Sequence, residues 1–184
     1  MNQSDILQEI NKGNFELTWF MLEISPENWI SVCNDALKID GVRFPVSYTL
    51  NKQIADIIGA KIMTEEIVNL IRLKATIQID PVVLPISNSW DATVKASQMI
   101  DKLITDKYRD IDQSKELISN CGKYWIEIDK KPGFANYGFF TTSSMWKGIK
   151  SYPVKNYNFY CIQPISTFHD ALHYDYSQTC SIWM

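Results

Sequence analysis

The hydrophobic pattern of this chain changes its period twice, and the order of these changes most constrains the fold. Up to about residue 48, short apolar segments rich in β-forming residues alternate with turn signals such as Asp40-Gly41. From Thr49 to about residue 107, apolar residues recur at the three-and-four spacing of amphipathic helices. From Gly122 onward, strand-like segments return. Strands, then helices, then strands again favour an α+β fold over a repeated βαβ unit.

The caps and periods predict individual elements. We expect helices near 4–12 and 49–59, a third from Thr64 that includes Ile71, and a fourth from Asn88 that includes Ile104, with Ser4 and Thr49 at the first two starts. Residues 108–120 are polar and charged, which leaves a helix and a connecting segment as alternatives. We expect strands near 15–24, 29–33, 42–48, 123–128, 134–142, 157–163 and 178–183, with a loop at 143–155. Gly138 is expected at a bulge or a close backbone approach. A length of 184 residues favours one domain, with a strand-and-helix part of about 1–120 and an antiparallel β part of about 121–184.

Charge and composition exclude several classes of partner. The formal net charge is -3 and no dense Lys/Arg run is present, so we predict no nucleic-acid partner. No apolar run approaches the roughly 20 residues of a membrane helix, which predicts no membrane insertion. The N-terminus has no signal-peptide pattern, which predicts a cytoplasmic protein, or a secreted one if this is a processed mature form.

Two residue types have alternative interpretations. The four cysteines lack Cys-x-x-Cys spacing, so we expect reduced, mostly buried thiols and no structural zinc site. The six tryptophans and the high aromatic content (12%) indicate a core built from large rings, with an aromatic-lined pocket as the alternative.

Several segments taken together resemble a family of bacterial, and in some cases phage-encoded, proteins that are often exported and have no characterised activity. The matching segments cover nearly the whole chain in order: 25–27, 40–45, 54–60, 64–71, 122–123, 132–138, 162–164, 169–170 and 175–178. The resemblance implies a shared fold and a shared site near the C-terminus, and it implies no named activity. The family usually has Trp-His where this chain has Phe139-Phe140, so any role of that histidine is absent here.

No other segment concentrates as many ionisable and nucleophilic side chains as residues 162–178. Both histidines, His169 and His173, occur there, four residues apart on one helical face or across a short loop. The candidate catalytic residues are His169, Asp175, Ser177 and Lys123, and the candidate binding residues are Tyr137, His173, Asp170, Gln163 and Tyr176.

Three interpretations of this segment remain open. In the first, His169, His173 and Asp175 hold a catalytic zinc; no other cofactor is expected. In the second, His169 is a general base oriented by Asp170 or Asp175, and Ser177 is a nucleophile or a hydrogen-bond donor, while Lys123 or Tyr137 stabilises developing negative charge. In the third, the segment is a structural polar network that locks the last strand.

Two function classes follow from these interpretations. The first is a small hydrolase-like enzyme, and the frequent export of the similar proteins implies cell-wall-type material as its substrate. The second is a non-catalytic binding protein whose aromatic-rich pocket recognises a small ligand or a partner protein. The sequence names no substrate and no oligomeric state.

Overall fold

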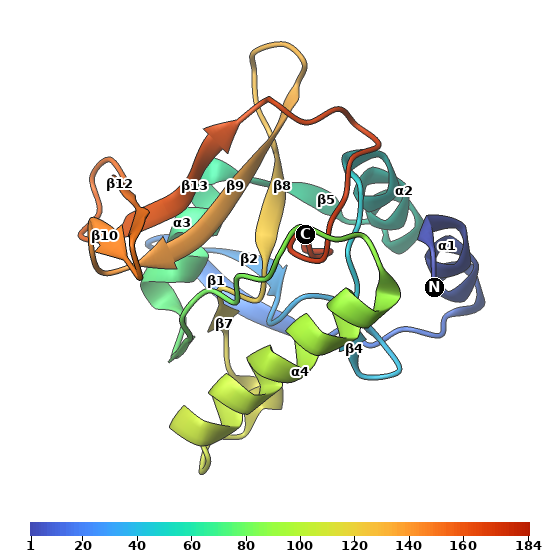
Figure 1. Cartoon of the computed structure of the whole chain (residues 1–184), viewed down its shortest axis with the longest axis horizontal. Helices are drawn as coiled ribbons and strands as arrows, with labels where there is room; N and C mark the ends of the chain where they lie inside the picture. Colours follow the sequence, from blue (N-terminus) through green and yellow to red (C-terminus); the bar gives the residue numbers. More distant parts are fainter.

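The computed structural model describes residues 1–184 and contains one large mixed sheet that combines both ends of the chain (Figure 1). Its eight strands, in spatial order, are β1 (Trp19–Ser25), β2 (Asn28–Cys33), β14 (Ile182–Trp183), β5 (Lys61–Thr64), β8 (Lys123–Glu127), β9 (Phe134–Thr141), β13 (Tyr160–Ser166) and β12 (Tyr152–Pro153). All neighbours pair antiparallel except β5 and β8, which are parallel. The α+β prediction is therefore confirmed.

The two parts predicted at 1–120 and 121–184 meet inside this sheet. The last strand, β14, lies between β2 and β5, so the C-terminus fills a gap between two N-terminal strands. In the parallel pair, Met63 of β5 lies opposite Ile126 of β8. The antiparallel group expected near the C-terminus is present as β8, β9, β13 and β12.

Four helices accompany the sheet, and each begins with a side-chain cap. They are α1 (Gln3–Lys12), α2 (Tyr48–Ile58), α3 (Glu65–Lys74) and α4 (Trp90–Lys107). Thr64 caps α3 and Gly59 ends α2 in the left-handed conformation, as predicted. The other caps shift by one or two positions: Asn2 replaces Ser4, Ser47 replaces Thr49 and Ser89 replaces Asn88. In each case a nearby polar side chain reaches the free N–H groups of the first turn.

Several short elements differ from the sequence-based boundaries. Six strands of two residues each form three separate pairs: β3 (Lys38–Ile39) with β4 (Val42–Arg43), β6 (Ile77–Gln78) with β7 (Ile118–Ser119), and β10 (Met145–Trp146) with β11 (Ile149–Lys150). A short 3-10 helix spans Gln113–Lys115. The region expected as a loop at 143–155 thus contains a small hairpin and an edge strand. The strand expected at 42–48 ends at Arg43, and the chain that follows pairs with the C-terminal segment instead, through a bridge between Pro45 and Thr179 and a hydrogen bond from Val46 N to Gln178 O at 2.8 Å.

Two hydrophobic clusters form the core, and the larger one spans both faces of the sheet, because it contains the successive β8 residues Tyr124, Trp125 and Ile126. The larger one packs α2 and α3 against the sheet, and its centre includes the fully buried Trp125, whose Nε1 donates to Val46 O at 2.7 Å. The smaller one lies beneath α4, which crosses in front of the sheet in Figure 1. All four cysteines are free and buried, as predicted. None of the helices combines the length and apolar character needed to cross a bilayer.

Candidate functional site

The histidine-containing segment is a loop that leaves β13 and crosses the front of the sheet before the chain enters β14 (Figure 1). Asp170 folds it locally: its Oδ1 accepts from Leu172 N at 2.8 Å, and its carbonyl accepts from His173 N at 3.2 Å. This turn stacks the imidazoles of His169 and His173, with ring centroids 3.9 Å apart and planes 6° from parallel. The short-loop alternative is therefore correct, and the helical one is wrong.

Asp175 forms the centre of the polar cluster. Its side chain is 7% exposed, and its Oδ1 accepts both the N–H of Ser177, at 2.8 Å, and the hydroxyl of Ser177. The backbone N–H of Asp175 donates to Gln178 Oε1 at 2.5 Å. These bonds form an Asx-type turn, which fixes the carboxylate and leaves Oδ2 free to face other side chains.

Lys123 and His173 both face this second oxygen. Lys123 Nζ lies 3.9 Å from Asp175 Oδ2, and His173 Nε2 lies 3.8 Å from the same atom. Burial lowers the pKa of Lys123, and the negative charge of Asp175 opposes that shift. His173 Nε2 is buried and has no hydrogen-bond partner. A buried nitrogen without a hydrogen-bond partner is unusual, and Asp175 Oδ2 at 3.8 Å is beyond hydrogen-bond distance.

His169 is held in its neutral form. Burial lowers its pKa, and the nearby His173 and Lys123 add to the shift, while Asp175 and Asp170 act in the opposite direction. A lowered pKa leaves the imidazole unprotonated around neutral pH. In that state it can accept a proton from a reacting group.

The loop reaches its place through contacts with the start of β8. Lys123 N donates to Ser177 O at 2.6 Å, and Lys123 also bridges Gln178 in parallel register. Gly122 makes this approach possible, because a Cβ there would lie 2.3 Å from Thr179 Oγ1 and 2.8 Å from Ser177 O. The glycine therefore sets the distance between the loop and the sheet.

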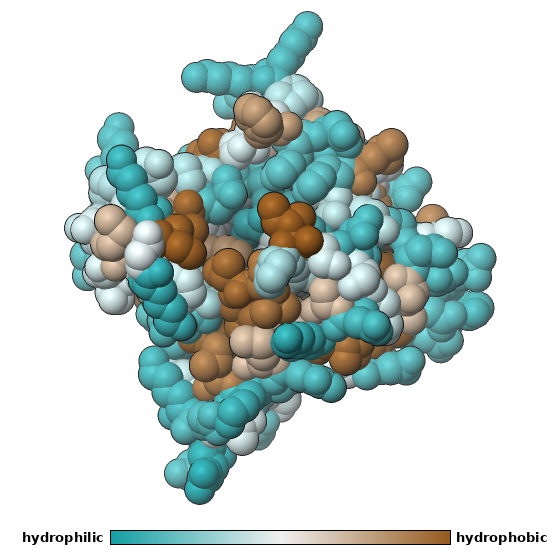
Figure 2. All heavy atoms as spheres, in the orientation of Figure 1, coloured by the Kyte–Doolittle hydropathy of each residue, from teal (hydrophilic) through white to brown (hydrophobic).

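These side chains line one open cleft of about 260 Å³. One wall is the extended segment that precedes α4, and Tyr176 anchors this wall by hydrogen bonds from its hydroxyl to Leu84 O at 2.8 Å and from Leu84 N at 2.5 Å. The apolar lining consists of Val83, Leu84, Ile86, Phe139, Ile149 and Ile162. Figure 2 shows apolar side chains gathered around a hollow in the middle of this face. The cleft is therefore polar at one end and apolar along its walls.

Most of the residues predicted for the site meet here. His169, His173, Asp175, Ser177, Lys123, Gln163 and Tyr176 all line the cleft. Ser177 is 4% exposed and its hydroxyl donates to Asp175, not to a histidine. This geometry agrees with the hydrogen-bond-donor alternative for Ser177.

Tyr137 and Asp170 do not line the cleft, so their predicted binding roles are corrected. Gly138 pairs with Lys123 on the cleft side of the sheet, so its neighbour Tyr137 points to the opposite side. There the hydroxyl of Tyr137 donates to Asn69 Oδ1 on α3, at 2.7 Å. Asp170 is exposed and its carboxylate shapes the turn described above.

Gly138 adopts a backbone conformation that favours glycine, whereas the contact that a Cβ would make with the neighbouring backbone is an ordinary one. Its φ is 136°, and a Cβ there would lie 3.4 Å from Lys123 Cα. The next residue, Phe139, has a φ of 59° and lines the cleft, whereas Phe140 packs against Tyr137 in the core with centroids 5.5 Å apart. Phe139 thus supplies an apolar residue of the cleft.

The metal alternative is not supported by the arrangement of the side chains. No group of three or more His, Cys, Asp or Glu side chains in the protein is placed to hold a metal ion. The stacked rings of His169 and His173 therefore do not form a three-ligand set with Asp175.

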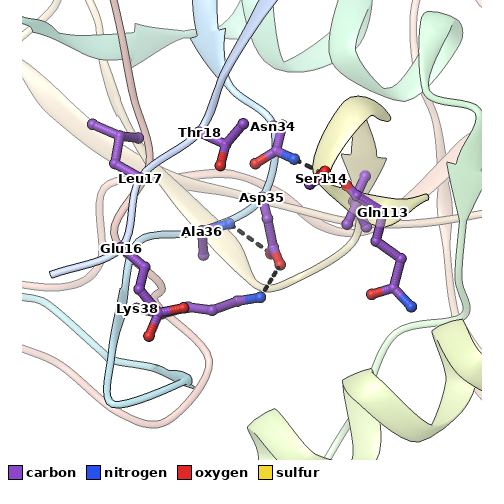
Figure 3. A pocket seen from close by; sticks show the side chains of 10 residues that line it. Glu16, Leu17, Thr18, Asn34, Asp35, Ala36, Lys38, Gln113 and Ser114 are labelled. Atoms are coloured by element: carbon purple, nitrogen blue, oxygen red, sulfur yellow. Dashed lines mark hydrogen bonds and ion pairs between the residues drawn. The ribbon is translucent and has the colours of Figure 1, made fainter.

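A second cavity, of about 210 Å³, lies beside the β3–β4 hairpin and is more polar (Figure 3). Its charged groups already have partners: Lys38 Nζ lies 2.9 Å from Asp35 Oδ2, and Glu16 Oε1 accepts from Gly41 N at 2.6 Å. Asp35 also pairs with the buried Arg43. The charged side chains of this cavity are therefore engaged within the protein, and their network holds the β3–β4 hairpin in place.

The apolar wall at 83–86 was missed by sequence reasoning. The only signal was a run of apolar residues between Pro81 and Pro85 that continues to Ile86 without helical or alternating period.

Comparisons with family models, curated proteins and solved structures found no match. The site is therefore described from its own geometry.

Proposed function

We propose that the protein is a small hydrolase that cleaves an ester or amide bond in the cleft around Asp175. The single observation that carries this proposal is the convergence of His169, His173, Lys123 and Asp175 in one open cleft. A neutral imidazole, a partly buried cation and a fixed carboxylate are the groups that hydrolysis of a carbonyl compound requires.

Each side chain has a distinct part in the proposed reaction. His169 accepts a proton from a water molecule as the water oxygen bonds to the carbonyl carbon. The negative charge that develops on the carbonyl oxygen faces the Nζ of Lys123. Collapse of this intermediate breaks the bond to the leaving group, which takes the proton back from His169. Asp175 keeps Lys123 charged, and Ser177 keeps Asp175 in place.

The water nucleophile is preferred to Ser177 for a geometric reason. Ser177 is 4% exposed and its hydroxyl is engaged with Asp175. A serine nucleophile needs a base within hydrogen-bond reach and access to the substrate. Cell-wall-type material as the substrate stays a prediction, because no residue of the cleft distinguishes it from other esters or amides.

A non-catalytic binding protein is the second candidate. The engaged hydroxyl of Ser177 favours it, since a fixed turn is sufficient for recognition. The Nζ of Lys123 would then bind an acceptor group of the ligand.

Hydrolysis of 4-nitrophenyl acetate, 4-nitrophenyl butyrate and amino-acid 4-nitroanilides separates the two candidates. We expect turnover by the wild type, with kcat/KM falling on the acid side along a limb whose pKa is below the usual value of about 6.5 for histidine. His169→Ala should lose about 10²-fold or more in kcat while keeping its unfolding free energy.

Asp56→Asn is the control, because Asp56 is exposed on α2 and lies outside the cleft, so the same chemical change leaves the site intact. It should keep the wild-type rate. An unchanged rate in His169→Ala would exclude the base role, and binding of these compounds without any turnover would favour the second candidate.

A further inference from the structure

A third cavity, a groove larger than the cleft around Asp175, adjoins that cleft. It has a volume of about 470 Å³ and lies between α4, the segment before α4 and the β10–β11 hairpin. Its apolar residues include Val82, Val83, Met99, Leu103, Trp146 and Ile149. The volume lies in the range typical of small-molecule sites, which is about 300–1,000 Å³.

The groove and the cleft share walls. Val83 and Ile149 line both of them. The segment from Asp80 to Ile86 runs along both, with its first residues in the groove and its last ones in the cleft. The two cavities are therefore neighbouring parts of one trough whose polar end is at Lys123 and Asp175.

Apolar side chains along this trough are unusually open to solvent. Val83 is 44% exposed, Met99 40%, Ile149 37% and Ile86 86%. Single exposed apolar residues are normal, but a contiguous set around a hollow marks a surface that binds another apolar group. Figure 2 shows this gathering of apolar atoms in the middle of the face that carries α4.

Three of the four charged residues of the groove, Lys102, Asp106 and Lys147, are engaged by other side chains, and the fourth, Asp80, is exposed and has no ion-pair partner. Lys102 Nζ lies 2.8 Å from Asp106 Oδ2, and Lys147 Nζ lies 4.6 Å from the ring centroid of Trp146. The occupant of the groove is therefore expected to carry no negative charge over its length, in contrast to the group that faces Lys123.

We propose that the ligand of this protein is an amphiphile: its carbonyl-containing polar end lies at Lys123 and Asp175, and its aliphatic tail lies along the groove between α4 and the β10–β11 hairpin. The inference deepens the proposed function by naming the substrate class. It rests on that function only in the position of the polar end.

Binding of straight-chain saturated carboxylic acids of four to twelve carbons, measured by calorimetry below their micelle concentrations, tests the tail site without turnover. Burial of one methylene contributes about 0.8 kcal/mol, which corresponds to a roughly fourfold gain in affinity per carbon until the groove is full. Lys123→Met should weaken all acids by a similar factor, because it removes the cation that faces their common carboxylate.

Met99→Lys should reduce the gain per carbon, since Met99 lines the groove and is exposed enough for the variant to fold. Ile57→Lys is the matched control: Ile57 is 47% exposed on α2 and lies outside both cavities. An affinity that does not depend on chain length would overturn the tail site. The same reduction of the gain per carbon in Met99→Lys and in Ile57→Lys would also overturn it. An equal affinity in Lys123→Met would overturn the proposed orientation.

The corresponding 4-nitrophenyl esters separate this inference from the proposed function. Turnover without chain-length dependence would leave the hydrolase proposal intact and overturn the tail site. Chain-length-dependent binding of the acids, with no turnover of any ester, would support the tail site and count against the hydrolase.

Discussion

Lys123 Nζ lies 3.9 Å from Asp175 Oδ2, although the two residues are separated by most of the C-terminal half of the chain. The pair forms because the loop after β13 returns to the start of β8, where Lys123 N donates to Ser177 O. One contact between a loop and a strand end therefore positions both the cation and the carboxylate of the cleft.

Asp175→Asn should lower the pKa of Lys123 below its wild-type value. Burial already lowers this pKa, and the charge of Asp175 is the influence that opposes burial. Removing the charge leaves burial unopposed, so a smaller fraction of Lys123 is charged at a given pH, and turnover should fall with it. The pKa can be followed by NMR of the Lys123 Nζ.

Asp170→Asn serves as the comparison for this titration, since its carboxylate is exposed and occupied by Leu172 N. It should leave the pKa of Lys123 unchanged. An unchanged pKa in Asp175→Asn would show that the two side chains do not interact in solution.

Gly122→Ala should destabilise the protein by about 1–3 kcal/mol, because the added methyl would overlap Thr179 and the carbonyl of Ser177. The relief of the overlap would move the loop away from β8 and weaken the contacts of Asp175. Urea unfolding gives the free energy, and the affinity for a carboxylic acid gives the effect on the cleft.

Adding Thr179→Ala to Gly122→Ala should restore part of the lost stability. This second change removes the two side-chain atoms nearest to the new methyl and leaves Ser177 O at 2.8 Å. A double variant no more stable than Gly122→Ala would assign the cost to the backbone contact alone.

The helices could be predicted well from the sequence because their signals are local. The stripe of apolar residues and the caps Thr64 and Gly59 lie within each helix or at its ends. The sheet order could not be predicted, since it depends on pairings between distant segments. The insertion of β14 between β2 and β5 has no local signal in residues 182–183.

The polar part of the site was predictable and its walls were not. Two histidines and two aspartates close together in the sequence indicate a titratable cluster whatever the fold. The side of the sheet to which Tyr137 points depends on register with β8, which the sequence does not state. Residues 83–86 form a wall of the cleft because Leu84 is hydrogen-bonded to Tyr176, and these two residues are far apart in the chain.

Tyr137→Phe should cost stability and spare the cleft. The hydroxyl of Tyr137 is buried and donates to Asn69 Oδ1 at 2.7 Å, so the variant leaves an unpaired acceptor in the core. The expected loss is about 1–3 kcal/mol of unfolding free energy in urea. Ligand affinity and turnover should match the wild type, and a selective loss of either would return Tyr137 to the site.

Arg43→Leu should be the most destabilising of these single changes. Arg43 pairs with Asp35 through Nη2 at 2.6 Å and Nε at 2.8 Å, and Nη1 reaches Asp101 at 2.7 Å. The side chain of Asp35 is 5% exposed, so the variant would leave a buried carboxylate with Lys38 as its remaining cation. Removing one partner of a buried pair costs about 3–5 kcal/mol.

The pH dependence of stability identifies this pair directly. Burial raises the pKa of Asp35, but the charges of Arg43 and Lys38 outweigh it and hold that pKa well below its usual value of about 3.9. Because the folded-state pKa is depressed, this stabilisation is present above the unfolded-state pKa and is lost as pH falls below about 5. In Arg43→Leu burial is opposed by Lys38 alone, so the loss of unfolding free energy between pH 7 and pH 3 should be smaller than in the wild type.

The double variant Asp35→Asn with Arg43→Leu provides the control for this measurement. It removes the uncompensated charge, so it should recover part of the stability lost in Arg43→Leu at pH 7, and its acid dependence should be the weakest of the three proteins. Urea unfolding at both pH values measures these differences. Exposed ion pairs contribute up to about 1 kcal/mol to stability. If Arg43→Leu lowers the unfolding free energy by less than that at pH 7, the buried pair of Arg43 and Asp35 is not a major stabilising contact of the fold.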